Sequence, residues 1–118
     1  MVRKTFDLEI QELRDEVLIL GSLVEHALLT SVEAMKKRDL ALSEQVIAGD
    51  AVINQKRFAI ENRIMEIIAT QQPMARDLRT LAAILEISTE LERMGDYAKG
   101  ICRINTMLGD EPFAVMLA

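Results

Sequence analysis

Half of the 118 residues are hydrophobic, with three Phe, one Tyr and no Trp, a mixture that favours a single domain of helices packed on helices. The net charge of −5 argues against binding to nucleic-acid phosphates, because such binding needs a basic face. One cysteine excludes an intramolecular disulfide, and the first residues carry no signal-peptide core, so we expect a cytoplasmic protein.

Apolar side chains recur at alternating steps of four and three residues along the first third of the chain, which predicts one long helix over residues 5–38. The positions are Phe6, Ile10, Leu13, Val17, Leu20, Val24, Ala27, Ser31 and Ala34. Lys36, Lys37 and Arg38 follow in the last turn, where cations oppose the helix dipole. The longest uncharged run, Val17 to Val24, is shorter than the about 20 residues that span a bilayer, so we expect no direct membrane insertion.

Two further helices follow from capping and breaking residues. Asp39 is placed to cap a second helix that runs to about residue 70, with Val46, Ile53, Ile60, Ile64 and Ile67 along one face. Pro73 ends this helix and starts a third, over residues 73–108. The third helix has two apolar stripes, one of which includes Ile87 and Met94, so we expect it to be the most buried element.

Tight connections near residues 38–40 and 71–73 force neighbouring helices to run antiparallel. The predicted fold is therefore all-α: an up-down-up three-helix bundle over residues 4–108. Residues 109–118 lose the periodicity and have two interpretations, a tail that docks on a neighbour or the start of a missing second repeat. The bundle has more apolar positions than its core needs, which predicts a homo-oligomer, most simply a homodimer.

Four polar residues are predicted to lie together across the seam between the second and third helices. Glu92 and Asp96 are one turn apart on one helix face, and counting from the turn near Gln72 brings Asp50 and Asn54 to the same height. Carboxylates in such a place must be paired, hydrated or bound to metal. Two interpretations stay open: a metal site, which Glu25 could join, or an ion-pair network with nearby cations. The cations are Arg93, Lys99 and Arg103.

Specific sequence blocks connect this pattern to a known family. The chain carries Gln-Gln-Pro-Met-Ala-Arg-Asp-Leu-Arg at 71–79 and Leu-Glu-Arg-Met-Gly-Asp-Tyr-Ala at 91–98, after Val-Ile-Ala-Gly-Asp at 46–50. Together with a first block that contains Phe6, Glu9, Ile10 and Leu13, these resemble one repeat of the PhoU family of phosphate-uptake regulators, over nearly the whole chain. Members of that family commonly carry two repeats in tandem.

The resemblance implies a cytoplasmic adaptor that helps to repress the phosphate-starvation response. Its expected partners are a phosphate ABC transporter, through the ATPase, and a membrane sensor histidine kinase. The resemblance also implies iron or another multivalent metal ion at Asp50, Asn54, Glu92 and Asp96. Asn54 stands where the family has a second acid, so it supplies an oxygen without charge and weakens the predicted site.

No catalytic constellation is present in the sequence: there is no Ser/His/Asp arrangement, no Gly-rich phosphate loop and no Cys-x-x-Cys. We therefore expect no enzyme. Cys102 is interpreted as a buried small hydrophobe and His26 as a surface residue. Two other functions remain alternatives: a metal-binding helical bundle whose carboxylates are the function, and a generic helical oligomerisation module.

Overall fold

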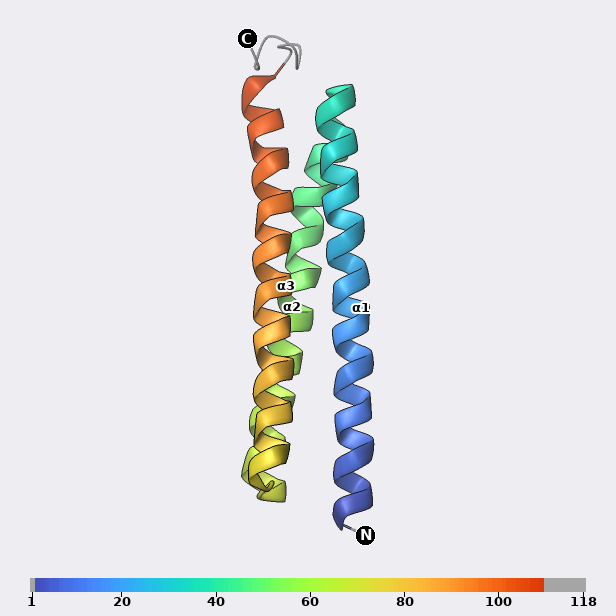
Figure 1. Cartoon of the computed structure of the whole chain (residues 1–118). Coiled ribbons are helices and arrows are strands. Elements are labelled where there is room, and N and C mark those ends of the chain that lie inside the picture. The colour runs from blue at the N-terminus through green and yellow to red at the C-terminus, as the bar shows by residue number, and fades with distance from the viewer. Residues whose placement is uncertain (1, 110–118) are drawn as a thin grey trace.

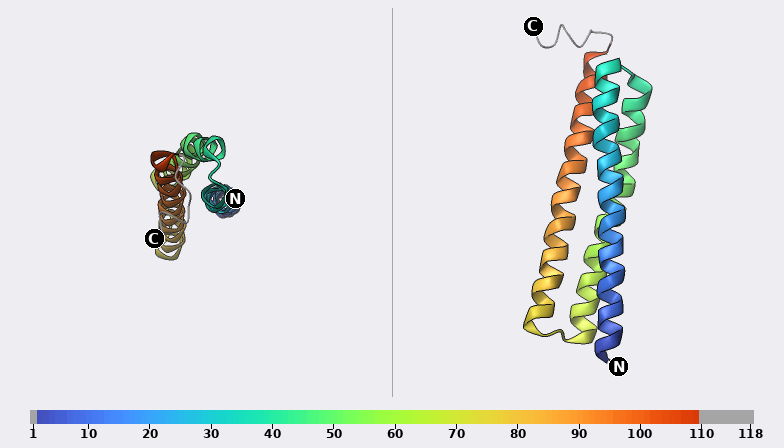
Figure 2. Two further views of the ribbon diagram at one scale, coloured as in Figure 1. Left: turned by 90° about the horizontal axis from the view of Figure 1, so that it is seen from above. Right: turned by 45° about the vertical axis from the view of Figure 1, so that its right-hand side comes forward.

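The computed structural model describes residues 2–109, which form three long helices (Figure 1). Helix α1 spans Val2–Lys37, α2 spans Leu40–Gln71 and α3 spans Ala75–Leu108. Consecutive helices run antiparallel along a body that measures 61 × 22 × 17 Å, and each helix packs on the other two. Figure 2 shows the three helices grouped around the long axis. The predicted all-α, up-down-up three-helix bundle is confirmed.

The buried face of α1 is the one that its apolar period predicts. Every predicted position is buried except Val17, which is half-buried and packs against the core. Steps of four and three residues keep one narrow stripe facing the other two helices along the whole length, as in a coiled coil. The core therefore extends from Phe6 near one end to Ala34 near the other.

Helix α1 also has the length and composition of a membrane span. An 18-residue window within Arg3–Lys37 has a hydropathy of 1.5 and is 22% buried in the bundle. The core helix of a soluble bundle passes the same test, and α1 carries the buried stripe just described, so the window is weak evidence for a span.

The first connection differs in detail from its prediction. Helix α1 ends at Lys37, because Arg38 adopts a left-handed conformation with φ of 53°. Arg38 therefore does not lie in the last turn of α1, where it was predicted. Its guanidinium donates to the carbonyl oxygen of Asn105, at 3.2 Å, and to that of Gly109. It thus satisfies carbonyls at the end of α3, which have no partner inside that helix. Asp39 caps α2 as predicted, accepting from the backbone N–H of Leu42 at 3.0 Å.

The second connection places Pro73 outside both helices. Gln72 ends α2 in a left-handed conformation, with φ of 47°, and Met74 is the residue that precedes α3. The carboxylate of Asp77 accepts the backbone N–H of Met74 at 3.3 Å, so α3 starts at Ala75 rather than at residue 73.

Helix α3 buries one line of positions rather than two stripes. These positions again follow steps of four and three residues, and all are buried except Leu91, which is half-buried and packs against the core: Asp77, Leu81, Ile84, Ser88, Leu91, Gly95, Ala98, Cys102 and Asn105. Ile87 and Met94, predicted to be buried, are 50% and 40% exposed. Small and polar residues occupy much of this inner line, so apolar side chains do not mark the buried face of α3.

Polar side chains close the core where α1 ends and α2 begins. Asn105 donates from Nδ2 to the carbonyl of Ala34 at 3.2 Å and to Ser43 Oγ at 2.7 Å. Cys102 beside them is fully buried, as predicted, and burial raises the pKa of its thiol. This thiol is therefore a poor nucleophile near neutral pH.

Candidate functional site

Asp50 lies in the interior of the bundle, at the seam between α2 and α3. The residue is only 3% exposed. Its Oδ2 accepts from Asn54 Nδ2 at 3.2 Å and lies 3.3 Å from Lys99 Nζ on α3. Its Oδ1 is buried and has no hydrogen-bond partner among the residues that the structure describes. The buried carboxylate of Asp50 is thus held by the Lys99 ammonium and the Asn54 amide, and its Oδ1 is still able to accept a hydrogen bond.

Gly95 allows α2 and α3 to approach closely at this level. A Cβ atom at Gly95 would lie 3.3 Å from Ile53 Cγ2 and 3.6 Å from Asp50 Oδ1. The first distance is tight enough that Ile53 would have to move. The missing side chain of Gly95 is therefore what permits this close helix approach.

Glu92 is held by a cation that the sequence analysis missed. Arg57 Nε lies 2.5 Å from Glu92 Oε2, and Arg57 NH1 lies 2.5 Å from Glu61 Oε2. Arg57 therefore joins α3 to α2 with one guanidinium that serves two carboxylates. The missed signal was its position, since Arg57 stands between Ile53 and Ile60 in the same four-and-three repeat.

The structure does not bring the four predicted residues together as one ligand set. Asp50 and Asn54 are hydrogen-bonded to each other, whereas Glu92 contacts Arg57 and Asp96 is exposed. Among residues 2–109 no group of three His, Cys, Asp or Glu side chains is arranged to hold a metal ion. The donors described within one chain therefore do not fit a complete metal site, and metal binding stays a prediction.

The other predicted participants have separate surroundings. Lys99 contacts Asp50, as the ion-pair interpretation expects, while Arg93 pairs with Glu90 on its own helix at 3.5 Å. Glu25 on α1 is exposed. Interhelical ion pairs are thus present across the α2–α3 seam, with Lys99 and Arg57 as their cations.

A second charged contact closes the opposite end of the bundle. The buried carboxylate of Asp77 accepts from Arg3 NH1 at 2.7 Å, which ties the start of α3 to the start of α1. This hydrogen bond lowers the pKa of the Asp77 carboxyl below its ordinary value. Asp77 lies in the first turn of α3, where a carboxylate is also favoured by the helix dipole.

An apolar groove of about 680 Å³ lies between α1 and α2, in the half of the bundle near their connection. Leu23, Leu29 and Thr30 line it from α1, and Val46 and Val52 line it from α2. Leu29 is 65% exposed, so the groove presents apolar surface to solvent. His26 stands at its edge and is exposed, as predicted for a surface residue.

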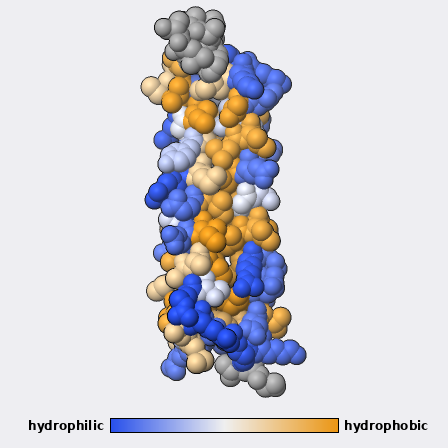
Figure 3. Space-filling model, in the orientation of Figure 1, coloured by the Kyte–Doolittle hydropathy of each residue, from blue (hydrophilic) through white to orange (hydrophobic). Residues whose placement is uncertain are grey.

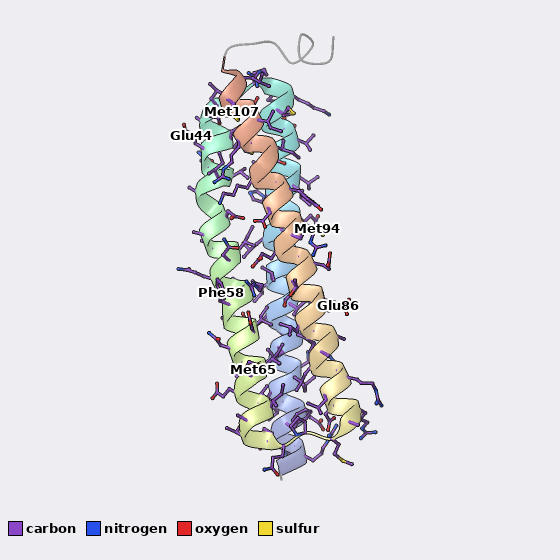
Figure 4. All side chains as sticks on the ribbon, turned by 90° about the vertical axis from the view of Figure 1, so that its left-hand side faces the viewer. Glu44, Phe58, Met65, Glu86, Met94 and Met107 are labelled. Carbon is purple, nitrogen blue, oxygen red and sulfur yellow. The ribbon has the colours of Figure 1, made fainter. Side chains whose placement is uncertain are left out.

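Apolar side chains are also exposed elsewhere on the bundle. Figure 3 shows an apolar band along the length of one face, between hydrophilic side chains. Figure 4 shows Met94 and Met107 on the outside of α3, and Phe58 and Met65 on α2. Each of the four is at least 40% exposed. Contiguous apolar surface of this kind is typical of proteins that bind other proteins.

Comparison with known proteins supports the resemblance. The family model described as the PhoU domain matches residues 17–104. The chain is 42% identical over 98 residues to the phosphate-specific transport system accessory protein PhoU of Edwardsiella tarda, covering 83% of this chain and 40% of that protein. It is 38% identical over 112 residues to the homologous protein of Clostridium acetobutylicum, covering 94% of this chain and 51% of that protein.

The corresponding protein of Escherichia coli is 40% identical over 98 residues, which cover 83% of this chain and 41% of that protein. The chain thus spans about half the length of the curated relatives that it matches. The match to the domain extends over most of the three described helices. By its sequence and its three-helix architecture, the chain belongs to the PhoU family.

Proposed function

We propose that this chain is a cytoplasmic, non-enzymatic adaptor of a phosphate transport system. In this role it represses the phosphate-starvation response by contacting the ATPase of a phosphate ABC transporter and a sensor histidine kinase. The names of its relatives support a part in phosphate transport. The observation that carries the adaptor role is the exposed apolar surface on all three helices, which suits binding to other proteins.

The exposed apolar side chains of α3 lie in a regular row on its outer face. Ile87, Met94, Tyr97 and Ile104 are each at least 40% exposed and follow one another at helical spacings of seven, three and seven residues. A row of this kind can receive another helix with interlocking side chains. We assign this row to a second copy of the chain, because exposed apolar side chains in a regular row need a matching surface to cover them. The result is a homodimer with a self-complementary interface.

The oligomer is tested by light scattering. We expect the mass of a dimer at micromolar concentrations, and a monomer for the variant Met94→Glu with Ile104→Glu, because two buried charges would face their copies across the interface. The control is Leu8→Glu with Leu18→Glu on α1, which changes two apolar residues outside the row that are more exposed than Met94 and Ile104. A monomeric mass for the parent chain over the whole range would overturn the homodimer.

The adaptor role is tested by complementation and co-purification. For complementation, the chain is expressed in a bacterium that lacks its own PhoU and carries a reporter of the phosphate-starvation response. For co-purification, the tagged chain is expressed together with the transporter ATPase and the kinase of its own source and is then purified through its tag. We expect lower reporter output in high phosphate and recovery of both partners. A chain that self-associates, recovers neither partner and leaves the reporter high would favour the generic oligomerisation module instead.

Metal binding is the second candidate function, and one observation favours it. Asp50 Oδ1 is a buried oxygen without a hydrogen-bond partner among the described residues, and a carboxylate oxygen is a good ligand for a hard cation. Iron or another multivalent ion bound there would need further ligands from a second copy, or carboxylates released from Arg57 and Lys99. The positive charge of the ion would balance the carboxylates of Asp50 and Glu92 at the contact between α2 and α3.

Elemental analysis and melting with and without chelator test the metal candidate. If metal binds, Glu92→Gln with Asp96→Asn abolishes metal uptake and leaves the helical content unchanged. If the carboxylates only form ion pairs, Glu92→Gln alone lowers the melting temperature because Arg57 loses a partner, whereas exposed Asp96→Asn does not. An unchanged melt in chelator with no bound metal in the purified protein excludes the metal function.

A further inference from the structure

The sequence through the first connection contains neither of the two residue types that most strongly break a helix. Residues 22–48 include no Gly and no Pro, although helices commonly end at a glycine. Only Arg38 and Asp39 separate α1 from α2, so the local sequence also suits one continuous helix. The second connection differs, because Pro73 prevents α2 from continuing into α3.

The turn at Arg38 is strained. Its φ of 53° lies in the left-handed region, where the Cβ atom of a residue other than glycine crowds the following carbonyl oxygen. Arginine is also one of the better helix-forming residues. A continuous helix through residue 38 would remove the strain, so contacts elsewhere in the bundle must hold the turn.

Those contacts come from the end of α3, which lies at the same end of the bundle as the connection (Figure 2). The guanidinium of Arg38 donates to the carbonyl oxygens of Asn105 and Gly109. The side chain of Asn105 is fully buried and donates to the carbonyl of Ala34 on α1 and to Ser43 Oγ on α2. The last turn of α3 therefore holds α1 and α2 together beside the strained turn.

From these observations we propose that Arg38 and Asp39 form a hinge, at which α1 exchanges between two copies of the chain. When the last turn of α3 releases the hinge, α1 and α2 join into one helix, and α1 packs against α2 and α3 of the second copy. The buried stripe of α1, from Phe6 to Ala34, then meets the same side chains as in the closed chain, so the exchange preserves its contacts. The inference goes beyond the proposed role in phosphate transport and does not depend on it.

The exchanged pair is distinguishable from a homodimer through the outer row of α3. In the closed chain, Arg63 NH2 on α2 lies 2.8 Å from Glu12 Oε2 on α1. A dimer through the α3 row leaves each Glu12 beside the Arg63 of its own chain, whereas the exchange places it beside the Arg63 of the other chain. The two side chains are 62% and 39% exposed, so cysteines at these positions are accessible to a reagent.

Cross-linking between two singly substituted chains tests the exchange. Chains with Glu12→Cys and chains with Arg63→Cys are unfolded together in urea, refolded over a range of protein concentrations and treated with a short bifunctional maleimide. Cys102 is fully buried and does not compete, and either variant refolded alone is the control for accidental contact. We expect a cross-linked product with the mass of two chains, whose share rises with protein concentration. No such product from mixed chains that regain their helical content would overturn the proposal.

Leu40→Pro separates the closed turn from the continuous helix. Leu40 is the first residue of α2, where proline is tolerated, and Asp39 before it has φ of −91° and ψ of 97°, the extended conformation that precedes proline. The same proline would lie in the interior of a continuous helix and break it. We expect Leu40→Pro to lower the yield of the cross-linked pair about tenfold or more, and Leu40→Ala to leave it within about twofold. Equal yields for the two variants would refute the hinge.

Two substitutions at Arg38 test the strain without relying on a proline. Arg38→Gln and Arg38→Gly both remove the guanidinium that binds α3, but only glycine adopts a φ of 53° without strain. We expect Arg38→Gln to give more of the cross-linked pair than the unchanged hinge, and about fivefold more than Arg38→Gly, which favours the closed turn and disfavours the helix. A yield for Arg38→Gly equal to or above that for Arg38→Gln would show that the left-handed turn does not drive the exchange.

Discussion

Replacing Lys99 by methionine removes the cation that holds the buried carboxylate of Asp50. Asp50 is 3% exposed, and its remaining hydrogen bond among the described residues comes from Asn54 at 3.2 Å. Methionine keeps much of the length and apolar stem of lysine, so the loss of charge dominates the effect. The expected result is a large loss of stability with the helical fold retained at low temperature.

The magnitude follows from the burial of the pair. Removing one partner of a fully buried ion pair costs about 3–5 kcal/mol. The Lys99 side chain is 27% exposed, so water screens part of the interaction and about 2–3 kcal/mol remains. The entropy of unfolding of a chain of 118 residues makes each kcal/mol worth about 4 °C, so the melting temperature should fall by about 8–12 °C.

Thermal melts followed by circular dichroism, at one fixed protein concentration, measure this effect. The matched control is Arg93→Met, which breaks an exposed pair with Glu90 on the same helix and should cost less than about 0.5 kcal/mol. The double variant Asp50→Asn with Lys99→Met should recover most of the loss, because the unpaired buried charge is gone. If Lys99→Met melts within about 2 °C of Arg93→Met, Lys99 does not hold Asp50 and the reasoning is wrong.

Three further expectations concern close packing and the closed ends of the bundle. Gly100→Ala should stabilise the chain by about 1 kcal/mol, since nothing lies within 4 Å of the added Cβ. Gly95→Ala should not stabilise it, because the added Cβ meets Ile53 at 3.3 Å. Equal melting temperatures for the two variants would contradict this expectation. Because the pKa of Asp77 is lowered in the folded state, its carboxylate stabilises the fold above the unfolded-state pKa, and this stabilisation is lost as pH falls below about 4. The melting temperature of Asp77→Asn should therefore fall less than that of the parent chain between about pH 7 and about pH 2. Arg38→Gln should increase amide hydrogen exchange in the last turn of α3 and leave its first turn unchanged, because the guanidinium donates to carbonyls at the end of that helix.

The sequence determined the features that depend on local chemistry. The apolar period of α1 predicts its buried face because large apolar side chains occupy the first six positions of that stripe, from Phe6 to Val24. Asp39 and Pro73 located the two connections to within two residues. The carboxylate of Asp39 caps the backbone that follows it, and Pro73 lacks a backbone N–H, so both effects depend only on residues close in sequence. The motifs at 71–79 and 91–98 were enough to identify the family.

The tertiary structure decided which groups face each other across the helices. The inner line of α3 runs through Ser88, Gly95 and Asn105, while Met94 is on the outside, so apolarity did not mark the buried face. Whether a small or polar residue is buried depends on the space and the hydrogen-bond partners that the other helices supply, which no single helix encodes. For the same reason the sequence placed Asp50 and Glu92 at one height in the bundle, but only the packing of α2 on α3 assigned Lys99 to Asp50 and Arg57 to Glu92.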